Sequence, residues 1–365
     1  MLDSTGSGLS QACWLGYGRL NRGREEGSHG HEEEVRVKIA LTGDVMLGRL
    51  VDQYVIQNRS VRPEALWGNV LPIMSAADYR FINLECVISG RGEPWHPATK
   101  AFHFRAGPRA IEFLQAAKID GVTLANNHVL DYGSEALLEC LKLLDGAGIK
   151  RSGAGATVDE TLLPAQFGNS DTRLAVVALT DNEPEWEASG TKPGVNFVAY
   201  NGRGLLQPYR SRVTRMFSFA RHHADLVIVS AHVGPNWGVP SREMQALAHE
   251  LIDMGADLYW GHSNHTPQGI EVYKGKAICH STGDFVDDYM VDKDERNDLS
   301  FLFVFEIEAN RFVRIRLYPT RIEDLGVRLA NMQEWQFLAR TMRAKCKAFG
   351  AIMDAEGQVG IVNLN

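Results

Sequence analysis

The chain has 365 residues, of which 44% are hydrophobic and 23% are charged, and these proportions exclude a disordered, collagen-like or coiled-coil protein. The 45 Asp and Glu residues outnumber the 38 Lys and Arg residues, and the formal net charge is -7. Because no block of basic residues stands out, we expect no nucleic-acid partner. No apolar run reaches the roughly 18 residues that a membrane span requires, and the five scattered cysteines form no C-x-x-C pair. We therefore expect a cytoplasmic protein without a membrane span.

In chain order, a leader precedes alternating strands and helices. Residues 1–34 are rich in glycine and charge and have no apolar period, so we expect them to be disordered. From Val35 onward, short β-branched runs alternate with stretches of helical period, which is typical of βαβ units. The predicted strands are 35–41, 79–84, 121–125, 173–179, 226–230, 258–260, 277–280, 299–306 and 312–318. The predicted helices are 50–57, 66–76, 108–118, 134–147, 206–221 and 242–254.

This alternation indicates a fold class. The continuous apolar run 226–229 is typical of a strand that is buried on both faces, whereas 299–306 and 312–318 suit an antiparallel hairpin at a sheet edge. We predict a layered α/β fold with mixed β-sheets flanked by helices. Residues 35–325 would form the main domain, and residues 326–365 a C-terminal helical extension packed on it.

Potential metal ligands follow five of the predicted strands. An isolated His at a strand end is more often a hydrogen-bonded structural residue than a ligand. Five such loops at one sheet edge are harder to explain, because a core gains nothing from so many ionisable groups. Open α/β sheets also bind ligands beyond the carboxyl ends of their strands. The residues are Asp44, Glu85, Asn127 with His128, His232, and His262 with His265.

The donor types of these residues indicate which ions they would bind. Imidazole, carboxylate and amide donors without a thiolate suit Mn²⁺, Fe²⁺ or Zn²⁺. Hydrolytic metal pairs also need a bridging carboxylate, and Glu85 at the end of the strand 79–84 is the natural candidate. We expect one or two divalent transition metals, which would activate a shared water.

An ordered set of motifs resembles the bacterial capsule-synthesis proteins of the CapA, or poly-γ-glutamate synthesis, type, which have a calcineurin-like metallophosphatase fold. The resemblance covers about residues 38–286. The matching segments are 43–49 (Gly-Asp-Val-Met-Leu-Gly-Arg), 83–85 (Asn-Leu-Glu), 104–106 (Phe-Arg-Ala), 124–133 (Leu-Ala-Asn-Asn-His-Val-Leu-Asp-Tyr-Gly), 255–257 (Gly-Ala-Asp) and 261–265 (Gly-His-Ser-Asn-His).

The resemblance implies roles for the strand-end residues. Asp44 and His265 would hold one metal, Asn127, His232 and His262 the other, and Glu85 would bridge the two. His128 would be the acid that protonates the leaving group. Asp131, three residues later, either orients His128 or starts the next helix. Met46 stands where the wider metallophosphatase pattern has a His, so the first metal site lacks one protein ligand.

Several residues are candidates for substrate binding. Arg49 and Arg105 can each hold a carboxylate or phosphate through two hydrogen bonds, and Arg105 is preferred because it lies within a matching motif. Two departures from the family pattern bear on the substrate. Asn236 follows His232 where the family usually has a carboxylate, and the later family motif Tyr-Ser-Leu-Gly-Asn-Phe here begins with His280 and carries Asp284.

The resemblance implies a metal-dependent hydrolase that uses a metal-bridging hydroxide on a small or polymeric anionic substrate. The family name points to γ-glutamyl amide bonds and the wider fold to phosphoesters, and the fold alone does not decide between them. One alternative is a non-catalytic capsule-assembly or ligand-binding protein that retains the metal cage. Another is a nucleotide-binding α/β protein, but the glycines at 153–155 are not followed by a P-loop Lys or by G-x-G-x-x-G spacing.

Overall fold

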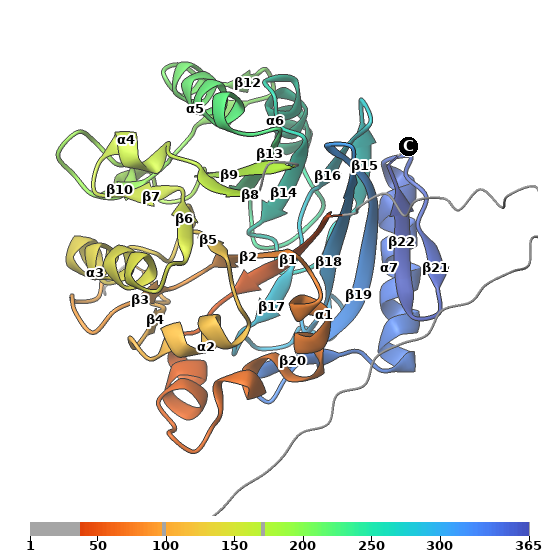
Figure 1. Cartoon of the computed structure of the whole chain (residues 1–365), viewed down its shortest axis with the longest axis horizontal. Helices are drawn as coiled ribbons and strands as arrows, with labels where there is room; N and C mark the ends of the chain where they lie inside the picture. Colours follow the sequence, from red (N-terminus) through yellow and green to blue (C-terminus); the bar gives the residue numbers. More distant parts are fainter. Residues whose placement is uncertain (1–36, 97–99, 169–171, 365) are drawn as a thin grey trace, which may run out of the picture. The chain divides into compact units, whose positions relative to one another are not determined.

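Two β-sheets packed face to face form the centre of the computed structural model, which describes residues 37–96, 100–168 and 172–364 (Figure 1). The expected leader, residues 1–34, lies outside these described residues. The first sheet has ten strands in the order β21-β22-β19-β18-β1-β2-β5-β6, with β17 paired to β1 and β20 to β19. The second sheet has six strands in the order β15-β16-β14-β13-β9-β8.

Each of the nine predicted strands corresponds to a strand of one of the two sheets, and the other strands were not predicted. The first sheet contains β1 (Val37–Val45), β2 (Tyr79–Leu84), β5 (Gly121–Thr123), β6 (Lys150–Ser152), β17 (Asp284–Val286), β18 (Leu299–Glu308), β19 (Arg311–Glu323), β20 (Gly326–Leu329), β21 (Asp354–Glu356) and β22 (Val359–Asn363). The second contains β8 (Ala165–Gly168), β9 (Arg173–Thr180), β13 (Leu226–His232), β14 (Leu258–His262), β15 (Ile270–Tyr273) and β16 (Lys276–Cys279). Three small pairs are β3 (Val87–Ile88) with β4 (Arg105–Ala106), β7 (Ala154–Gly155) with β10 (Gly194–Val195), and β11 (Tyr200–Asn201) with β12 (Gly204–Leu205).

Both sheets are mixed, as the sequence predicts. In the first sheet β1, β2, β5 and β6 run parallel, whereas β18 and β19 pair antiparallel beside them. In the second, β9, β13, β14 and β16 are parallel, with antiparallel strands at both edges. The layered α/β fold with mixed sheets is therefore confirmed.

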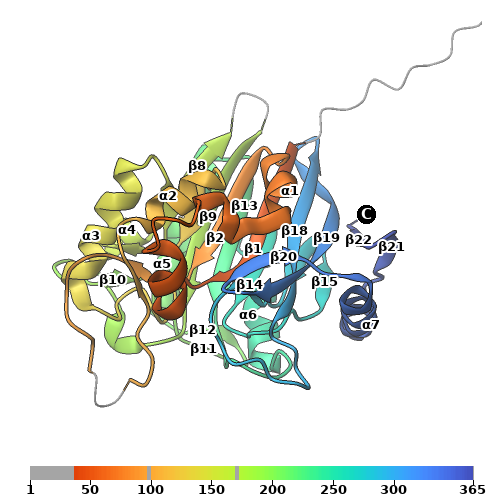
Figure 2. The same cartoon turned by 90° about the horizontal axis from the view of Figure 1, so that it is seen from below.

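Helices cover the outer faces of the two sheets. Figures 1 and 2 show α2 and α3 on one side of the sandwich and α5 and α6 on the other, which makes four layers. The helices are α1 (Leu71–Ser75), α2 (Ala110–Ala116), α3 (Gly133–Gly146), α4 (Val158–Thr161), α5 (Tyr209–His223), α6 (Arg242–Asp253) and α7 (Met332–Ala348), with short helical turns η1 (Val51–Ile56), η2 (Pro63–Val70) and η3 (Pro184–Trp186).

The burial pattern of β1 explains its continuous apolar sequence. Ile39 and Leu41 point into the core between the sheets, whereas Ala40 and Val45 pack into the core beneath the helices. Successive side chains of a strand alternate between its two faces. A strand with cores on both sides therefore has no polar face to show in its sequence.

One predicted helix is divided in the structure. The segment predicted as the helix 66–76 forms the tight turns of η2 followed by α1, because Gly68 has φ 48° and ψ -138° and breaks the helical path. A Cβ at Gly68 would lie 2.4 Å from the carbonyl oxygen of Val327. The break therefore depends on β20, a strand about 260 residues later in the chain.

The end of the chain adds strands as well as a helix. The predicted hairpin is confirmed as β18 and β19, joined at Ala309 and Asn310, which have φ of 47° and 55°. Beyond it, β20 and β22 pair with β19, and β21 pairs with β22, so residues 326–364 extend the first sheet around α7.

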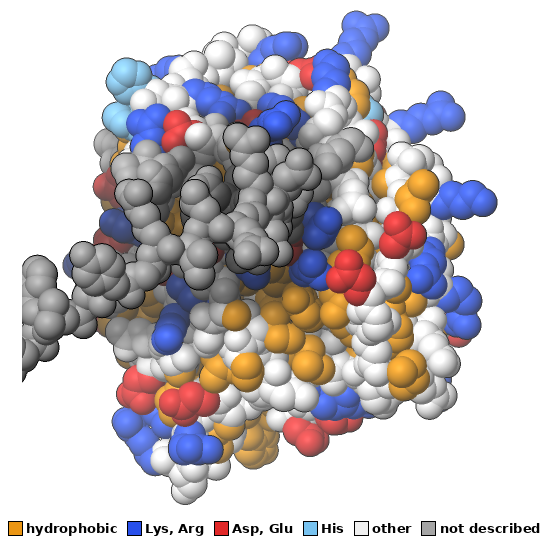
Figure 3. All heavy atoms as spheres, turned by 45° about the vertical axis from the view of Figure 1, so that its right-hand side comes forward, with side chains coloured by type: hydrophobic (Ala, Val, Ile, Leu, Met, Phe, Trp, Pro, Cys, Tyr) orange, Lys and Arg blue, Asp and Glu red, His pale blue; other side chains and the backbone are white. Residues whose placement is uncertain are grey.

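The surface carries charges of both signs. On the face in Figure 3, basic and acidic side chains are intermixed, and apolar side chains gather between them. In the part of the chain that the structure describes, no helix has the length and apolar character to cross a membrane.

Candidate metal centre and adjoining pocket

Strand register brings the strand-end residues of each sheet together. In the first sheet, Asp44 of β1 lies opposite Asp284 of β17 and Asn83 of β2. In the second, His232 of β13 lies opposite His262 of β14. Because the sheets face each other, the two sets meet at one end of the sandwich.

Glycines allow the backbones to approach closely beside these residues. A Cβ at Gly43, just before Asp44, would lie 2.0 Å from the carbonyl oxygen of Gly283. A Cβ at Gly261, just before His262, would lie 2.2 Å from the carbonyl oxygen of His280. Any side chain at either position would push the site-bearing strands apart.

A compact cluster of buried ligands lies at this meeting point. Among the described residues, ligand atoms of Asp44, Glu85 and His232 lie within 4.8 Å of one another. His262 donates from Nδ1 to Asp44 Oδ1 over 2.6 Å, and His232 Nε2 is 3.7 Å from Glu85 Oε1. Asn83 Nδ2 donates to Asp44 Oδ1 over 2.8 Å and lies 3.2 Å from His232 Nδ1. These contacts fix the orientation of each ring and carboxylate.

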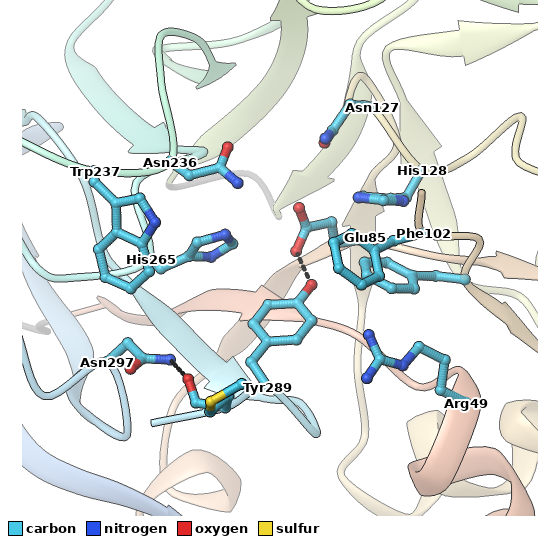
Figure 4. Close-up of a pocket in the computed structure, with 12 residues that line it drawn as sticks. Arg49, Glu85, Phe102, Asn127, His128, Asn236, Trp237, His265, Tyr289 and Asn297 are labelled. Atoms are coloured by element: carbon cyan, nitrogen blue, oxygen red, sulfur yellow. Dashed lines mark hydrogen bonds between the residues drawn. The ribbon is translucent and has the colours of Figure 1, made fainter. Parts of the chain in front are cut away.

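A pocket of about 290 Å³ opens above the cluster (Figure 4). Figure 4 shows Asn127, His128 and Phe102 on one side, Asn236, Trp237 and His265 on the other, and Glu85 between them. The lining residues are Arg49, Glu85, Phe102, Phe104, Asn127, His128, Asn236, Trp237, His265, Tyr289, Met290 and Asn297.

Two side chains hold the floor of the pocket in place. Tyr289 donates its hydroxyl hydrogen to Glu85 Oε2 over 3.2 Å. His265 Nδ1 lies 2.9 Å from Asp284 Oδ1, and its ring faces the cavity (Figure 4). With Nδ1 bonded to a carboxylate, Nε2 of His265 is the nitrogen left for a ligand.

His128 is held from behind by a carboxylate. Its Nδ1 donates to Asp131 Oδ2 over 2.6 Å, and its ring stacks on Phe104 with the ring centroids 3.8 Å apart. Asp131 Oδ1 is 3.1 Å from Lys100 Nζ, and Lys100 also pairs with Glu183 at 2.9 Å. The contact with Asp131 directs the other nitrogen of His128 toward the pocket that it lines.

The local charges keep Asp44 ionised and His232 neutral. Burial opposes ionisation of Asp44, but the neighbouring His262 and His232 and the Asn83 amide outweigh it and lower the pKa of Asp44 to about 2. Burial lowers the pKa of His232 to about 3 against the opposing charge of Asp44. A neutral imidazole beside a carboxylate is the state in which both can bind a metal.

Buried carboxyl groups gather on the opposite side of the cluster. Burial, followed by the charge of Asp44, raises the pKa of Glu85 well above its usual range. The same two causes raise the pKa of Asp284 well above its usual range, and burial followed by Asp284 does so for Asp287. A divalent cation at this place would allow these carboxyls to ionise.

The donor set fits a metal. Among the described residues, Asn127 Oδ1, His262 Nε2 and Asp284 Oδ2 are buried atoms without a hydrogen-bond partner. Buried polar atoms are ordinarily paired. With Nδ1 of His262 donating to Asp44, its Nε2 keeps a lone pair, and the amide oxygen of Asn127 is likewise an acceptor only. These atoms and the carboxylates of Asp44 and Glu85 match a transition-metal site without thiolates.

The structure separates the substrate-binding candidates. Arg49 and Asn236 line the pocket, and Asp284 lies beneath it in contact with His265. Arg105 does not line it: its guanidinium lies 4.0 Å from the Tyr132 ring centroid and donates to backbone carbonyls of the preceding loop. His280 is buried and contacts Glu271 at 3.0 Å, also away from the pocket lining.

Sequence reasoning missed several residues of this site. Tyr289 and Met290 follow β17 in a loop with no predicted element, and Asn83 lies in a matching motif but receives no role from the sequence. The adjacent Asp287 and Asp288 after an apolar strand were a signal that could have drawn attention to this loop. Lys100 has no sequence signal for its position, because its contact with Asp131 depends on tertiary structure.

Comparisons with known proteins place the chain in a family. A model of the bacterial capsule synthesis protein PGA_cap matches residues 38–289. A probable polyglutamine synthesis accessory protein of Mycobacterium tuberculosis is 30% identical over 86% of this chain and 92% of its own length. The capsule biosynthesis protein CapA of Bacillus anthracis is 29% identical over 71% of this chain and 61% of its own length. The PGA biosynthesis protein CapA of Bacillus subtilis is 28% identical over 78% and 71%, respectively.

Solved structures give more distant similarities. GAP50, the anchor in the inner membrane complex of Plasmodium, has a TM-score of 0.38 at 11% identity and covers 81% of this chain and 89% of that chain. The purple acid phosphatase PPD1 of yellow lupin has a TM-score of 0.36 at 9% identity, with 83% and 55% covered. Since the family model matches well over half of the chain, this protein belongs to the PGA_cap family of bacterial capsule synthesis proteins.

Proposed function

We propose that the chain is a metal-dependent hydrolase that cleaves an amide or phosphoester bond in an anionic substrate. The observation that carries the proposal is the set of buried ligand atoms at the floor of a pocket that His128 also lines. Buried polar atoms are ordinarily paired, and the unpaired acceptors Asn127 Oδ1 and His262 Nε2 both belong to this site.

The proposed ligand assignment follows the family resemblance. His232, His262 and Asn127 would hold one metal, Asp44 and His265 the other, and Glu85 would bridge them. Met46 supplies no ligand in this assignment, and its sulfur accepts a hydrogen bond from the Gly48 backbone over 3.0 Å. When bound, such ions lower the pKa of a coordinated water and offset the charge that develops on the attacked centre.

The protein's own contribution to the reaction is the handling of the leaving group. His128 would donate a proton from Nε2 to the departing oxygen or nitrogen, while Asp131 holds Nδ1 and favours the protonated ring. Burial outweighs Asp131 and lowers the pKa of His128, so the ring needs further negative charge beside it to hold a proton. An anionic substrate in the pocket would supply that charge.

The experiment that tests the metal assignment is elemental analysis after incubation with Mn²⁺, Fe²⁺ or Zn²⁺ and removal of free ions. We expect up to two ions per chain, loss of at least one in His262→Ala, and unchanged content in His223→Ala, which removes an exposed His of α5. Circular dichroism checks that both variants are folded. Wild-type protein without bound metal would refute the assignment.

The non-catalytic alternative has one observation in its favour, because the relative from Mycobacterium tuberculosis is named as an accessory protein. In that case the metals would bind as described, but no member of a panel of phosphoesters and γ-glutamyl amides would be turned over. Metal content and turnover measured on one preparation separate the two functions.

A further inference from the structure

Exposed apolar side chains from three separate loops surround the mouth of the pocket. Phe102 is 59% exposed, Trp237 is 42% exposed and Met290 is 91% exposed, and all three line the cavity. The three residues lie in different loops, and their exposed side chains contribute little to the hydrophobic core. The fold therefore does not require apolar residues at these positions. Exposed apolar residues gathered at one cavity are typical of a binding site.

Two of these residues form opposite walls. Figure 4 shows the Phe102 ring on the side of His128 and the Trp237 indole across the opening, beside His265. The centroids of the Trp237 and His265 rings are 5.5 Å apart, and Phe102 packs 6.5 Å from Phe104. Each wall of the pocket mouth is therefore formed by a pair of aromatic rings. The space between the two walls suits a flat apolar group.

The pocket lining contains little positive charge. Arg49 is the sole Lys or Arg among the described residues that line the cavity. Its Nε lies 3.2 Å from Asp288, and its guanidinium lies 5.5 Å from the Phe102 ring centroid. A polyanionic chain would therefore find one cationic side chain for its several charges, and it has no aromatic group to place beside Phe102 or Trp237.

We propose that the pocket selects substrates that carry a single anionic group, bound by Arg49 near the metal centre, next to a planar aromatic group that lies between Phe102 and Trp237. This inference rests on the proposed function, because it takes the pocket as the substrate site. It narrows the substrate class to aromatic phosphoesters or aryl-substituted amides, in preference to a polyanionic γ-glutamyl chain.

The test is calorimetric binding of three probes to the full chain: phenylphosphonate, methylphosphonate and a γ-linked tetraglutamate. We expect phenylphosphonate to bind about tenfold more tightly than methylphosphonate, the preference that one good aromatic contact supplies, and the tetraglutamate to bind most weakly. Titrations with Mn²⁺ and with chelator should give the same preference for phenyl over methyl, because the walls are protein. The preference thus remains measurable even if the hydrolase proposal fails.

Single substitutions, with a control outside the pocket, show which side chains contact the phenyl and phosphonate groups. Phe102→Ala and Trp237→Ala should remove most of the preference for the phenyl group while leaving methylphosphonate affinity unchanged. Phe219→Ala removes another exposed Phe, on α5 and outside the pocket lining, and should have no effect. Arg49→Met should weaken both phosphonates about tenfold. Equal affinity of the wild type for the two phosphonates, or tightest binding of the tetraglutamate, would overturn the inference.

Discussion

At the scale of single residues, His128 is the proposed acid beside a set of proposed metal ligands. We predict that His128→Ala keeps its metals and its fold but loses about 10²- to 10⁴-fold in turnover on substrates with poor leaving groups, the range for a positioned acid. The loss should be smaller for 4-nitrophenyl substrates, because nitrophenolate departs without a proton. Turnover of both substrate types and metal content are measured on one preparation.

Two other roles of His128 would each give a different experimental result. If His128 serves only the fold, through its stacking on Phe104 and its bond to Asp131, the variant would melt at a lower temperature and lose activity equally on good and poor leaving groups. Loss of metal in the variant would instead show that His128 is a ligand.

The residues of the site differ in how well sequence could predict them. Asp44, His232 and His262 end apolar strands, and parallel strands bring their carboxyl ends to one edge. Tyr289 and Phe102 lie in long loops whose path depends on packing. The preference for Arg105 over Arg49 rested on a motif, which does not reveal that Arg105 lies against Tyr132.

At the scale of elements, Gly261 tests the close approach of β14 to the segment after β16. We predict that Gly261→Ala lowers the free energy of unfolding by roughly 1–3 kcal/mol, because its Cβ would lie 2.2 Å from a backbone oxygen. It should also weaken metal binding by displacing His262. Gly146→Ala is the matched control: nothing lies within 4 Å of its Cβ, and in α3 it should be neutral or stabilising by up to about 1 kcal/mol. Denaturant unfolding measures both, and equal effects would refute the packing argument.

The start of α7 provides a pH-dependent contribution to stability. Glu334 accepts hydrogen bonds from the Asn331 backbone, Arg328 and Arg321. Burial acts to raise its pKa, but these donors outweigh burial and lower the pKa of Glu334 from 4.5 to about 2. Because the folded-state pKa lies below the unfolded one, the stabilisation is complete above about pH 4.5 and is lost as the pH falls toward 2.

Glu334→Gln should therefore lower the free energy of unfolding by about 1–3 kcal/mol at pH 7, and the difference from the wild type should shrink as the pH approaches 3. Glu64→Gln, at an exposed position, should change little at any pH. A Glu334→Gln difference that is constant between pH 7 and pH 3 would contradict the ionic origin of the effect.

The central strands of both sheets and the helices α3, α5 and α6 were predictable because each has a clear apolar period. Strands such as β13 carry continuous apolar runs, and α6 has a buried stripe. The break between η2 and α1 was not predictable, since it requires Gly68 to meet β20. The residue pattern around Gly68 does not reveal its contact with a strand so far away in the chain.

At the scale of the whole molecule, the function depends on the face-to-face arrangement of the two sheets. Asp44 lies near the end of β1 and Glu85 follows β2 in the first sheet, whereas His232 and His262 end strands of the second. The cluster therefore exists only when the two sheets are packed together. Layers with mixed sheets could be predicted from the alternation of elements. The strands that residues 326–364 add to the first sheet could not, because their pairing with β19 is long-range.

Turnover before and after chelation, on a panel of phosphoesters and γ-glutamyl amides, shows whether the chain is a metal-dependent hydrolase. We predict hydrolysis of at least one substrate that stops when metal is removed, returns when Mn²⁺, Fe²⁺ or Zn²⁺ is restored, and is absent in His262→Ala but normal in His223→Ala. Hydrolysis that continues at full rate in metal-free protein, or no hydrolysis of any panel member by metal-loaded protein, would contradict it.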